Sequence, residues 1–200
     1  MRTRALVLVA TCVLSSSAAA RADAFLAVTG GAMFPIGDDD WNNTVDAGPV
    51  LGLRGGGGRR VDPRSAVMVE ASFEYAPLSD NFSSSLVSID LTRYRALLGV
   101  RFERVMNSGP LVSLRGGVGI SHLIIEEASP LLPNLNTRTD TGLALEVGAG
   151  VWFPAGPAHI GVELALPIGI HNDDPEDNND IPSDFRTTEV SVLGGLRFSI

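Results

Sequence analysis

The residues best suited to chemistry in this chain are three histidines and one neighbouring serine. Ser121 and His122 are adjacent, while His159 and His171 lie further along the chain. A serine hydrolase needs its serine and histidine on one face, with a carboxylate that orients the imidazole. Neighbours on a strand face opposite sides, so Ser121 and His122 cannot form such a pair there. We expect no catalytic residue and interpret the histidines as structural residues at an interface.

A second group of candidate residues is acidic. The segment 171–180 reads HNDDPEDNND, and Asp38, Asp39 and Asp40 form a run in an earlier polar segment. Carboxylate and amide oxygens are the ligands that Ca²⁺ and Mg²⁺ prefer, so the segment 170–186 could bind a divalent cation. It lacks the glycine and the terminal glutamate of an EF-hand, and a solvated acidic loop has the same composition. We favour the solvated loop and predict no metal or other cofactor.

Arginines and glutamates form a third group, because they recur at alternate positions within otherwise apolar segments. Such residues could act as acid–base catalysts, or they could fill an interior as ion pairs, which we favour. The members of the group are Arg54, Glu70, Glu74, Arg93, Arg95, Arg101, Arg115, Glu146, Glu163, Glu189 and Arg197.

The segments that carry these charges have a period of two. In 67–75, valine, alanine, phenylalanine and tyrosine alternate with methionine, serine and glutamate, and 142–153, 159–168 and 189–200 repeat the pattern. This period indicates strands with two chemically different faces. We expect eight strands, at 25–34, 49–59, 66–76, 88–103, 111–123, 141–153, 158–169 and 187–200.

Two of these strands are less regular than the others. The second contains four consecutive glycines at 55–58, which assign no face. In the fourth, apolar residues occupy the even-numbered positions from Tyr94 to Phe102, whereas the earlier apolar residues Ile89 and Leu91 occupy odd-numbered positions. This reversal predicts a bulge or a loop extension at the start of the fourth strand.

The connections between the strands alternate in length. Short, turn-forming segments lie at 60–65, 104–110 and 154–157, and polar segments about twice as long lie near 35–48, 77–87, 124–140 and 170–186. In an up-and-down meander, alternate connections lie at opposite ends. All long loops therefore fall at one end, and the short turns fall at the other with both termini, as in bacterial transmembrane barrels.

The charged face contains glycine, serine and alanine between its arginines and glutamates. A solvated face would carry long polar residues instead, whereas small residues beside large charged ones suit the narrow interior of a closed barrel. Buried charges must be paired, and opposite signs fall on neighbouring strands. The expected partners are Glu70 and Glu74 with Arg54, Arg93, Arg95 and Arg101, Arg115 with Glu146, and Glu163 with Arg197.

The opposite face is apolar, and in a membrane it would contact hydrocarbon while ring closure pairs the backbone groups. Strands of about ten tilted residues are long enough to cross. Phe102, Phe153 and Phe198 fall at the short-turn end, where an aromatic girdle would lie. These features predict an all-β fold, an eight-stranded antiparallel up-and-down transmembrane β-barrel. The alternative is a soluble sandwich or lipocalin-like barrel with these aromatic residues in its core.

Composition agrees with one β domain of this kind. The chain has 200 residues, of which 44% are apolar, yet no run of about 18 apolar residues follows the N-terminus. A single cysteine excludes a disulfide framework. All 15 basic residues are arginine, and the net charge of −8 argues against nucleic acid as a partner.

The N-terminal residues have the pattern of a signal peptide. Arg2 and Arg4 precede an apolar run at 5–14, and the sequence Ala-Asp-Ala ending at Ala24 fits a cleavage site. We therefore predict a signal peptide at 1–24 and a barrel domain at 25–200. Acylation of Cys12 in a lipoprotein is the alternative. Cleavage after Ala24 removes Arg2, Arg4, Arg21 and Asp23 and moves the net charge from −8 to −10.

Short glycine motifs and the last strand give the chain a family resemblance. The first strand ends GGAMFP at 30–35, and Gly-x-Gly triplets occur at 117–119 and 148–150. With the signal peptide, these features resemble the small outer-membrane barrels of the OmpA/OmpX type. The strongest feature is the C-terminus, which resembles the strand signal read by the barrel-assembly machinery and ends in isoleucine where the family prefers an aromatic residue. The signal residues are Gly195, Phe198 and Ile200.

The resemblance implies a bacterial outer-membrane location, with extracellular long loops and periplasmic termini. It implies outer-membrane lipid, lipopolysaccharide and the barrel-assembly machinery as partners, and leaves the oligomeric state open. We expect a structural or surface-interaction role and no enzyme activity. The alternatives are a narrow solute channel, a barrel enzyme that modifies lipid A, and a secreted soluble binder.

Overall fold

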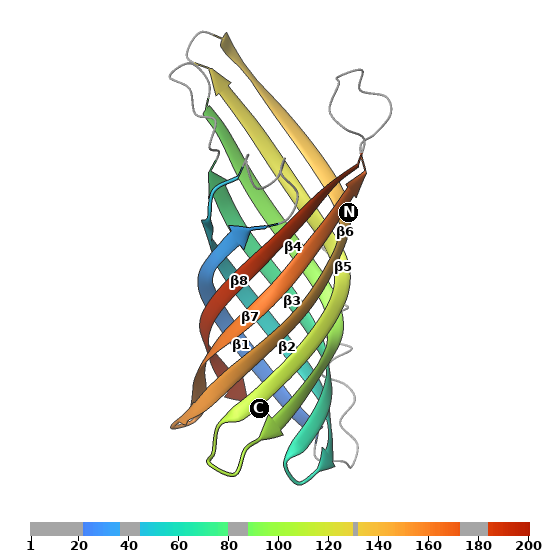
Figure 1. Ribbon diagram of the computed structural model, residues 1–200, viewed down its shortest axis with the longest axis vertical. Helices are drawn as coiled ribbons and strands as arrows, with labels where there is room; N and C mark the ends of the chain where they lie inside the picture. The colour runs from blue at the N-terminus through green and yellow to red at the C-terminus, as the bar shows by residue number, and fades with distance from the viewer. Residues whose placement is uncertain (1–21, 37–44, 80–87, 130–131, 173–183) are drawn as a thin grey trace.

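The two-residue alternation of the sequence is realised in eight antiparallel strands that close into a barrel in a computed structural model (Figure 1). The structure describes residues 22–36, 45–79, 88–129, 132–172 and 184–200. The strands are β1 (Ala22–Pro35), β2 (Gly48–Asp62), β3 (Ser65–Ser79), β4 (Ser88–Val105), β5 (Leu111–Ser129), β6 (Leu132–Ala155), β7 (Ala158–Asn172) and β8 (Asp184–Ser199). Each strand pairs with its neighbours in the chain, and β8 pairs with β1. The predicted eight-stranded up-and-down barrel is confirmed.

Burial alternates along the strands and shows which face is inside. On β3, Val69 is 58% exposed and Phe73 is 47% exposed, whereas Glu70 and Glu74 are 4% and 1% exposed. The barrel therefore carries its apolar side chains on the outer wall and its charges inside. Within the described residues, no helix has the length and apolar character needed to span a membrane.

The glycine tract at 55–58 lies within β2, whose pairing with β1 and β3 runs through it without a break. A Cβ atom on Gly58 would lie 2.0 Å from the carbonyl oxygen of Val67, and one on Gly56 would lie 2.5 Å from that of Val69. No real Cβ contact is that short, so glycine is required where the backbones of β2 and β3 approach on the inner side of the wall.

The predicted bulge at the start of β4 is wrong. The β4 residues from Ser88 onward pair in continuous register with β5, and those from Asp90 onward pair with β3. Leu91 is buried and faces inward with Arg93. The parity changes because the interior becomes apolar near the long-connection end, and the strand itself stays regular.

The short connections agree with the prediction and contain two glycines that the turns require. Gly109, between β4 and β5, has a φ of 101°, and Gly156, between β6 and β7, has a φ of 65°. These backbone conformations favour glycine over residues with a side chain. The short turns lie together at one end of the barrel, shown at the bottom of Figure 1.

The predicted loop at 124–140 is instead a long hairpin formed by β5 and β6. Ile124 pairs with Thr139 and Ile125 pairs with Arg138, so the connection shrinks to 130–131. The hairpin projects beyond the other strands at the long-connection end (Figure 1). Its β-branched isoleucines and threonines favour an extended backbone, although its polar composition resembles that of a loop.

The N-terminal boundary of the barrel lies close to the predicted cleavage site. Residues 1–21 fall outside the described part of the chain, and β1 begins at Ala22. The amide of Ile200 donates a hydrogen bond to the carbonyl oxygen of Ala24 at 2.9 Å. Cleavage after Ala24 stays a prediction.

Candidate functional site

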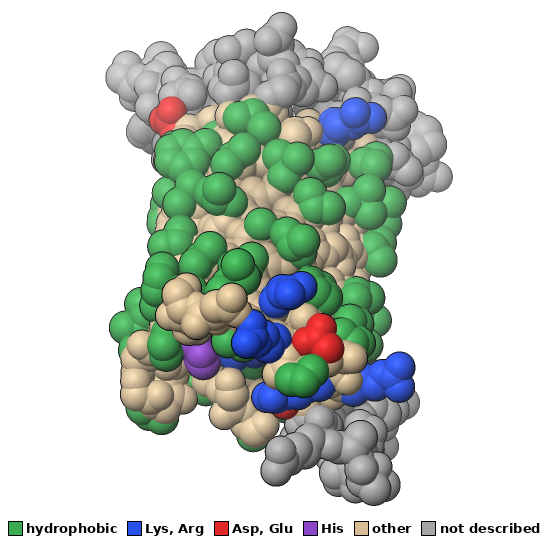
Figure 2. All heavy atoms as spheres, turned by 60° about the horizontal axis from the view of Figure 1, so that its bottom comes forward, with side chains coloured by type: hydrophobic (Ala, Val, Ile, Leu, Met, Phe, Trp, Pro, Cys, Tyr) green, Lys and Arg blue, Asp and Glu red, His purple; other side chains and the backbone are tan. Residues whose placement is uncertain are grey.

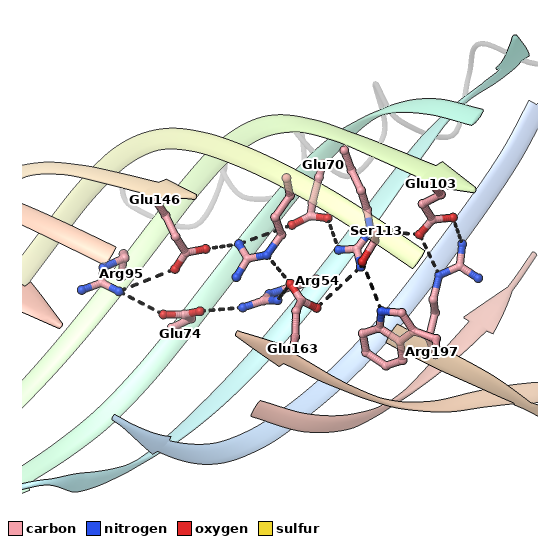
Figure 3. A network of polar contacts seen from close by, with 12 residues as sticks. Arg54, Glu70, Glu74, Arg95, Glu103, Ser113, Glu146, Glu163 and Arg197 are labelled. Atoms are coloured by element: carbon pink, nitrogen blue, oxygen red, sulfur yellow. Dashed lines mark hydrogen bonds and ion pairs between the residues drawn. The ribbon is translucent and has the colours of Figure 1, made fainter. Parts of the chain in front are cut away.

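The candidate site is a network of charged side chains that fills the interior of the barrel (Figure 3). All eleven predicted residues point inward, and each is at most 8% exposed. Glu103, which is 3% exposed, also belongs to it. The sequence alone could have identified Glu103, because it lies two residues after Arg101 and therefore on the same inward face of β4. This interior network consists of Arg54, Arg93, Arg95, Arg101, Arg115, Arg197, Glu70, Glu74, Glu103, Glu146, Glu163 and Glu189.

The interior network contains equal numbers of arginines and glutamates, six of each. Its formal charge is therefore zero, although the whole chain carries −8. An isolated charge taken out of water costs several kcal/mol, and a partner of opposite sign offsets that cost. The balance lets twelve ionised side chains share one narrow interior.

At the level nearest the long connections, β4 contacts β8 on the opposite side of the barrel. Arg93 pairs with Glu189, and Arg95 Nη2 lies 3.4 Å from Glu189 Oε2. Arg95 Nη1 also lies 3.2 Å from Glu74 Oε2 on the neighbouring strand. Because the contacts with Glu189 cross the interior, they connect β4 and β8, which are not hydrogen-bonded to each other.

At the middle level, Arg54 and Arg115 converge on Glu163. Arg54 donates hydrogen bonds to Glu163 at 2.5 Å and to Glu74 at 2.8 Å. Arg115 pairs with Glu163 and with Glu146. Glu163 on β7 is therefore linked to both β2 and β5 and lies near the centre of the network in Figure 3.

At the level nearest the short turns, Arg101 and Arg197 share Glu103. Arg101 Nε lies 2.9 Å from Glu103 Oε1, and Arg197 Nη2 lies 2.6 Å from Glu103 Oε2. Arg101 also donates a hydrogen bond to Glu70 at 2.7 Å. The guanidinium carbons of Arg101 and Arg197 lie 5.1 Å and 4.9 Å from the ring centre of Phe25, within cation–π range.

The predicted partners are only partly the observed ones. Glu74 contacts Arg54 and Arg95, and Arg115 contacts Glu146. The predicted pair of Glu163 with Arg197 is wrong. Glu163 stands opposite Leu193 in the β7–β8 register, and Arg197 stands opposite His159. The two side chains thus lie at different levels, and each finds its partner across the interior.

Two clusters of apolar side chains also face the interior, one towards each end of the barrel. The cluster at the long-connection end consists of Met33, Val45, Val50, Ala76, Leu78, Leu91, Leu123 and Leu193. The cluster at the short-turn end consists of Phe25, Ala27, Ala66 and Met68. At the long-connection end the apolar side chains extend past Arg93, because Leu78 stands opposite Leu91. At the short-turn end they lie beside the ion pairs, because Met68 stands opposite Arg101 and Ala66 opposite Glu103. A cavity of about 180 Å³ lies at the short-turn end, and its lining includes Arg60, His159 and Arg197.

The histidines do not assemble a hydrolytic site with Ser121. Ser121 is fully buried inside, whereas His122 lies on the outer wall, where its Nδ1 is 2.7 Å from Thr141 Oγ1. His171 lies inside near the long-connection end, with its Nδ1 2.8 Å from Asp140 Oδ2. His159 is half-buried at the opposite end of the barrel.

Most of the predicted cation-binding segment lies outside the described residues, which omit 173–183 and Asp38 to Asp40. In the described ranges, no group of three or more His, Cys, Asp or Glu residues is arranged to hold a metal ion.

The predicted assembly signal lies on β8, the strand that closes the barrel. Phe198 pairs with Leu26 and Gly195 pairs with Thr29 on β1. Phe198 is 40% exposed and Ile200 is 80% exposed, so both present their side chains on the outside. Recognition of these residues by an assembly machinery stays a prediction.

The outer wall is apolar over a continuous band (Figure 2). Among the described outward-facing residues, no charge lies between Arg59 and Arg104 at one end and Asp90 and Glu126 at the other. Exposed Phe102, Phe153 and Phe198 border the band near the short turns. Tyr75 and Tyr94, with ring centres 5.4 Å apart, lie nearer the other border.

A closed barrel with an apolar outer wall and a charged interior is a transmembrane β-barrel, because only lipid can cover such a wall. The chain belongs to the outer membrane protein beta-barrel domain family, whose model matches residues 5–198. The protein is therefore located in the bacterial outer membrane, and the predicted family resemblance is confirmed.

Solved outer-membrane barrels have the same fold. Ail of Yersinia pestis is 17% identical, with 90% of this chain and 100% of that chain covered and a TM-score of 0.51. Neisserial surface protein A is 12% identical, with 90% and 99% covered and a TM-score of 0.53. A major outer membrane protein of Thermus thermophilus is 14% identical, with 88% and 99% covered and a TM-score of 0.52. No curated protein sequence matches this chain. At these identities, the likeness shows the fold alone.

Proposed function

We propose that this protein is a closed barrel with a structural or surface-contact role, and that it is neither a pore nor an enzyme. The observation that carries the proposal is the charge-balanced interior network, whose buried ion pairs cross the barrel and which an apolar cluster covers at the long-connection end. A barrel of this kind offers partners its ends and its outer wall, because side chains occupy its interior.

The proposal excludes steady ion conduction. Arg54 to Glu163 and Arg95 to Glu189 are ion pairs that cross the interior, and an ion would have to displace them after passing an apolar cluster. Planar lipid bilayers containing the purified protein should show no steady unit conductance. Uniform, long-lived current steps would support the narrow channel and contradict the closed barrel.

An enzyme acting on lipid A would have to use the outer wall, where the half-buried His122 lies on β5. Its Nδ1 contacts the hydroxyl of Thr141, whereas a catalytic histidine needs a carboxylate to orient the imidazole. Replacement of His122 by alanine should leave the lipid A profile of expressing cells unchanged. A changed profile would contradict the absence of enzyme activity.

The surface-contact role belongs to the end that carries the long connections. Their sequences are rich in aspartate, including Asp38 to Asp40 and the segment 171–180. Ail has been solved with sucrose octasulfate, a heparin analogue and hence a polyanion. The acidic connections of this chain suit a cationic surface instead. Cells displaying the protein should bind polylysine-coated beads more than heparin-coated beads, compared with cells lacking it; the reverse preference would contradict this role.

The proposed orientation places the long connections outside the cell and both termini in the periplasm. Two substitutions test it, Pro63→Cys in the β2–β3 turn and Thr137→Cys on the β5–β6 hairpin, where Thr137 is exposed and stands opposite Glu126 at the border of the apolar band. The one native cysteine, Cys12, lies in the predicted signal peptide. A membrane-impermeant maleimide should label intact cells with Thr137→Cys and not those with Pro63→Cys. The opposite labelling would reverse the orientation.

A further inference from the structure

Four exposed arginines gather at the short-turn end, on β2, on β4 and in the β2–β3 turn. They form an arginine patch consisting of Arg59, Arg60, Arg64 and Arg104. Figure 2 shows basic side chains gathered at this end beside the hydrophobic wall. The strand register brings them together, because Arg60 stands opposite Ala66 on β3 and Arg104 stands opposite the adjoining Ser65.

Two members of the arginine patch lie on the membrane-facing side of the wall. Arg59 lies on the same outer face of β2 as Leu53, which is 48% exposed. Arg104 lies on the same outer face of β4 as Phe102, which is 38% exposed. Val67 on β3 lies between the two strands. It pairs with Arg59 on one side and on the other with Phe102, two residues before Arg104. The guanidinium groups therefore border the apolar band, at the depth where lipid headgroups meet hydrocarbon.

Acidic neighbours neutralise the arginine patch only in part. Asp62 accepts a hydrogen bond from the backbone N–H of Arg64 at 2.7 Å, and its carboxylate also attracts the guanidinium group of Arg104. Arg60 Nε lies 2.7 Å from Asp23 Oδ2. Asp23 precedes the predicted mature start at Phe25, so cleavage there removes this partner. The patch is then the basic end of a protein that is acidic as a whole.

We propose that the arginine patch binds the phosphate groups of anionic phospholipids in the periplasmic leaflet of the outer membrane. The assignment to that leaflet rests on the proposed orientation. Guanidinium groups suit phosphate because their fork of N–H donors matches two phosphate oxygens. A nucleic acid or an acidic protein would need arginines facing water, whereas Arg59 and Arg104 face the lipid side.

Lipid binding to the purified full-length barrel in detergent tests the proposal. The protein is titrated with dioleoylphosphatidylglycerol and with dioleoylphosphatidylcholine, and bound lipids are counted by native mass spectrometry. The wild type should prefer phosphatidylglycerol. The variant R59Q/R104Q should lose that preference, by about fivefold in affinity for each arginine removed. These two side chains are exposed, and migration on a gel with and without boiling verifies that the variant is folded.

The control is R138Q/R186Q, which removes the same charge near the long-connection end. It should bind phosphatidylglycerol as the wild type does. Equal binding of the two lipids by the wild type, or equal losses in both double variants, would overturn the proposal.

The cysteine labelling separates this proposal from the orientation. If the turn at Pro63 is protected from maleimide and phosphatidylglycerol is not preferred, lipid binding alone is overturned. If phosphatidylglycerol is preferred but the turn is labelled from outside, the proposed orientation fails and the assignment to the periplasmic leaflet is overturned with it.

Discussion

Glu163 is the residue on which most of the interior network converges. Its carboxylate receives a hydrogen bond from Arg54 at 2.5 Å, pairs with Arg115, and lies 3.5 Å from Arg101. Three arginines from three strands thus depend on one buried anion. The removal of one partner from a buried pair is strongly destabilising, because the remaining charge is left uncompensated.

Replacement of Glu163 by glutamine should therefore lower the free energy of unfolding by about 3–5 kcal/mol. Urea titration of the protein in lipid vesicles, followed on gels by the mobility of the unboiled form, measures the loss. Glu126→Gln is the matched control, because Glu126 is exposed near the end of β5. The control should change stability by less than about 0.5 kcal/mol; similar losses in both variants would contradict a central role for Glu163.

Asp62 provides a pH-dependent contribution outside the membrane. The backbone N–H of Arg64 donates a hydrogen bond to its carboxylate at 2.7 Å, and this bond holds the pKa of Asp62 below its ordinary value. A lowered pKa in the folded state stabilises the fold above the unfolded pKa, about 3.9, and this contribution is lost as pH falls through the folded pKa. Asp62→Asn should thus be less stable than the wild type at pH 7.

The difference between Asp62→Asn and the wild type should shrink below about pH 4. Urea midpoints measured from pH 7 to pH 2 provide the comparison. A difference that stays constant over this range would show that the ionised carboxylate of Asp62 contributes nothing to stability.

At the scale of the strands, the glycines of β2 make different demands on the inner and outer sides of the wall. A Cβ on Gly58 would lie 2.0 Å from the Val67 oxygen, whereas the nearest atom to a Cβ on Gly57 is 3.9 Å away. Gly58→Ala should lower the free energy of unfolding by about 1–3 kcal/mol, because the wall must shift. Gly57→Ala should have almost no effect. The fraction that migrates as a folded barrel without boiling, across a urea series, compares these neighbours.

The facing of the strands was predictable because burial in a two-sided wall has a period of two. The same reasoning failed where one side changes character along a strand. At Leu91 the interior becomes apolar, so apolar residues change from the outer to the inner face. In the sequence, this change of face resembles a bulge or a loop extension. In the β5–β6 hairpin, polar residues such as Thr137 and Asp140 have the composition of a loop, although they are paired with β5. The pairing of Ile124 with Thr139 depends on the partner strand, which composition does not report.

At the scale of the whole barrel, the alternation along each strand shows which charged residues face inward. It does not show which of them contact one another. Adjacent strands follow from the meander, so the pair of Arg115 and Glu146 was predictable. The contact of Arg54 with Glu163 joins β2 to β7, and the contact of Arg93 with Glu189 joins β4 to β8. Such contacts depend on the stagger between strands when the ring closes, which is a property of the whole ring.

Charge balance is likewise a property of the whole interior, and it predicts a difference between two double substitutions. R115M/E146M removes one charge of each sign and keeps the interior neutral, whereas R54M/R115M removes two positive charges. Each variant replaces two buried charged side chains with methionine. The neutral variant should lose less stability than the sum of R115M and E146M, by about 0.5–3 kcal/mol. The unbalanced variant should fold poorly, because it leaves carboxylates such as Glu163 short of partners. Urea titration in vesicles compares the two variants, and equal stabilities would show that local packing governs the interior instead of charge balance.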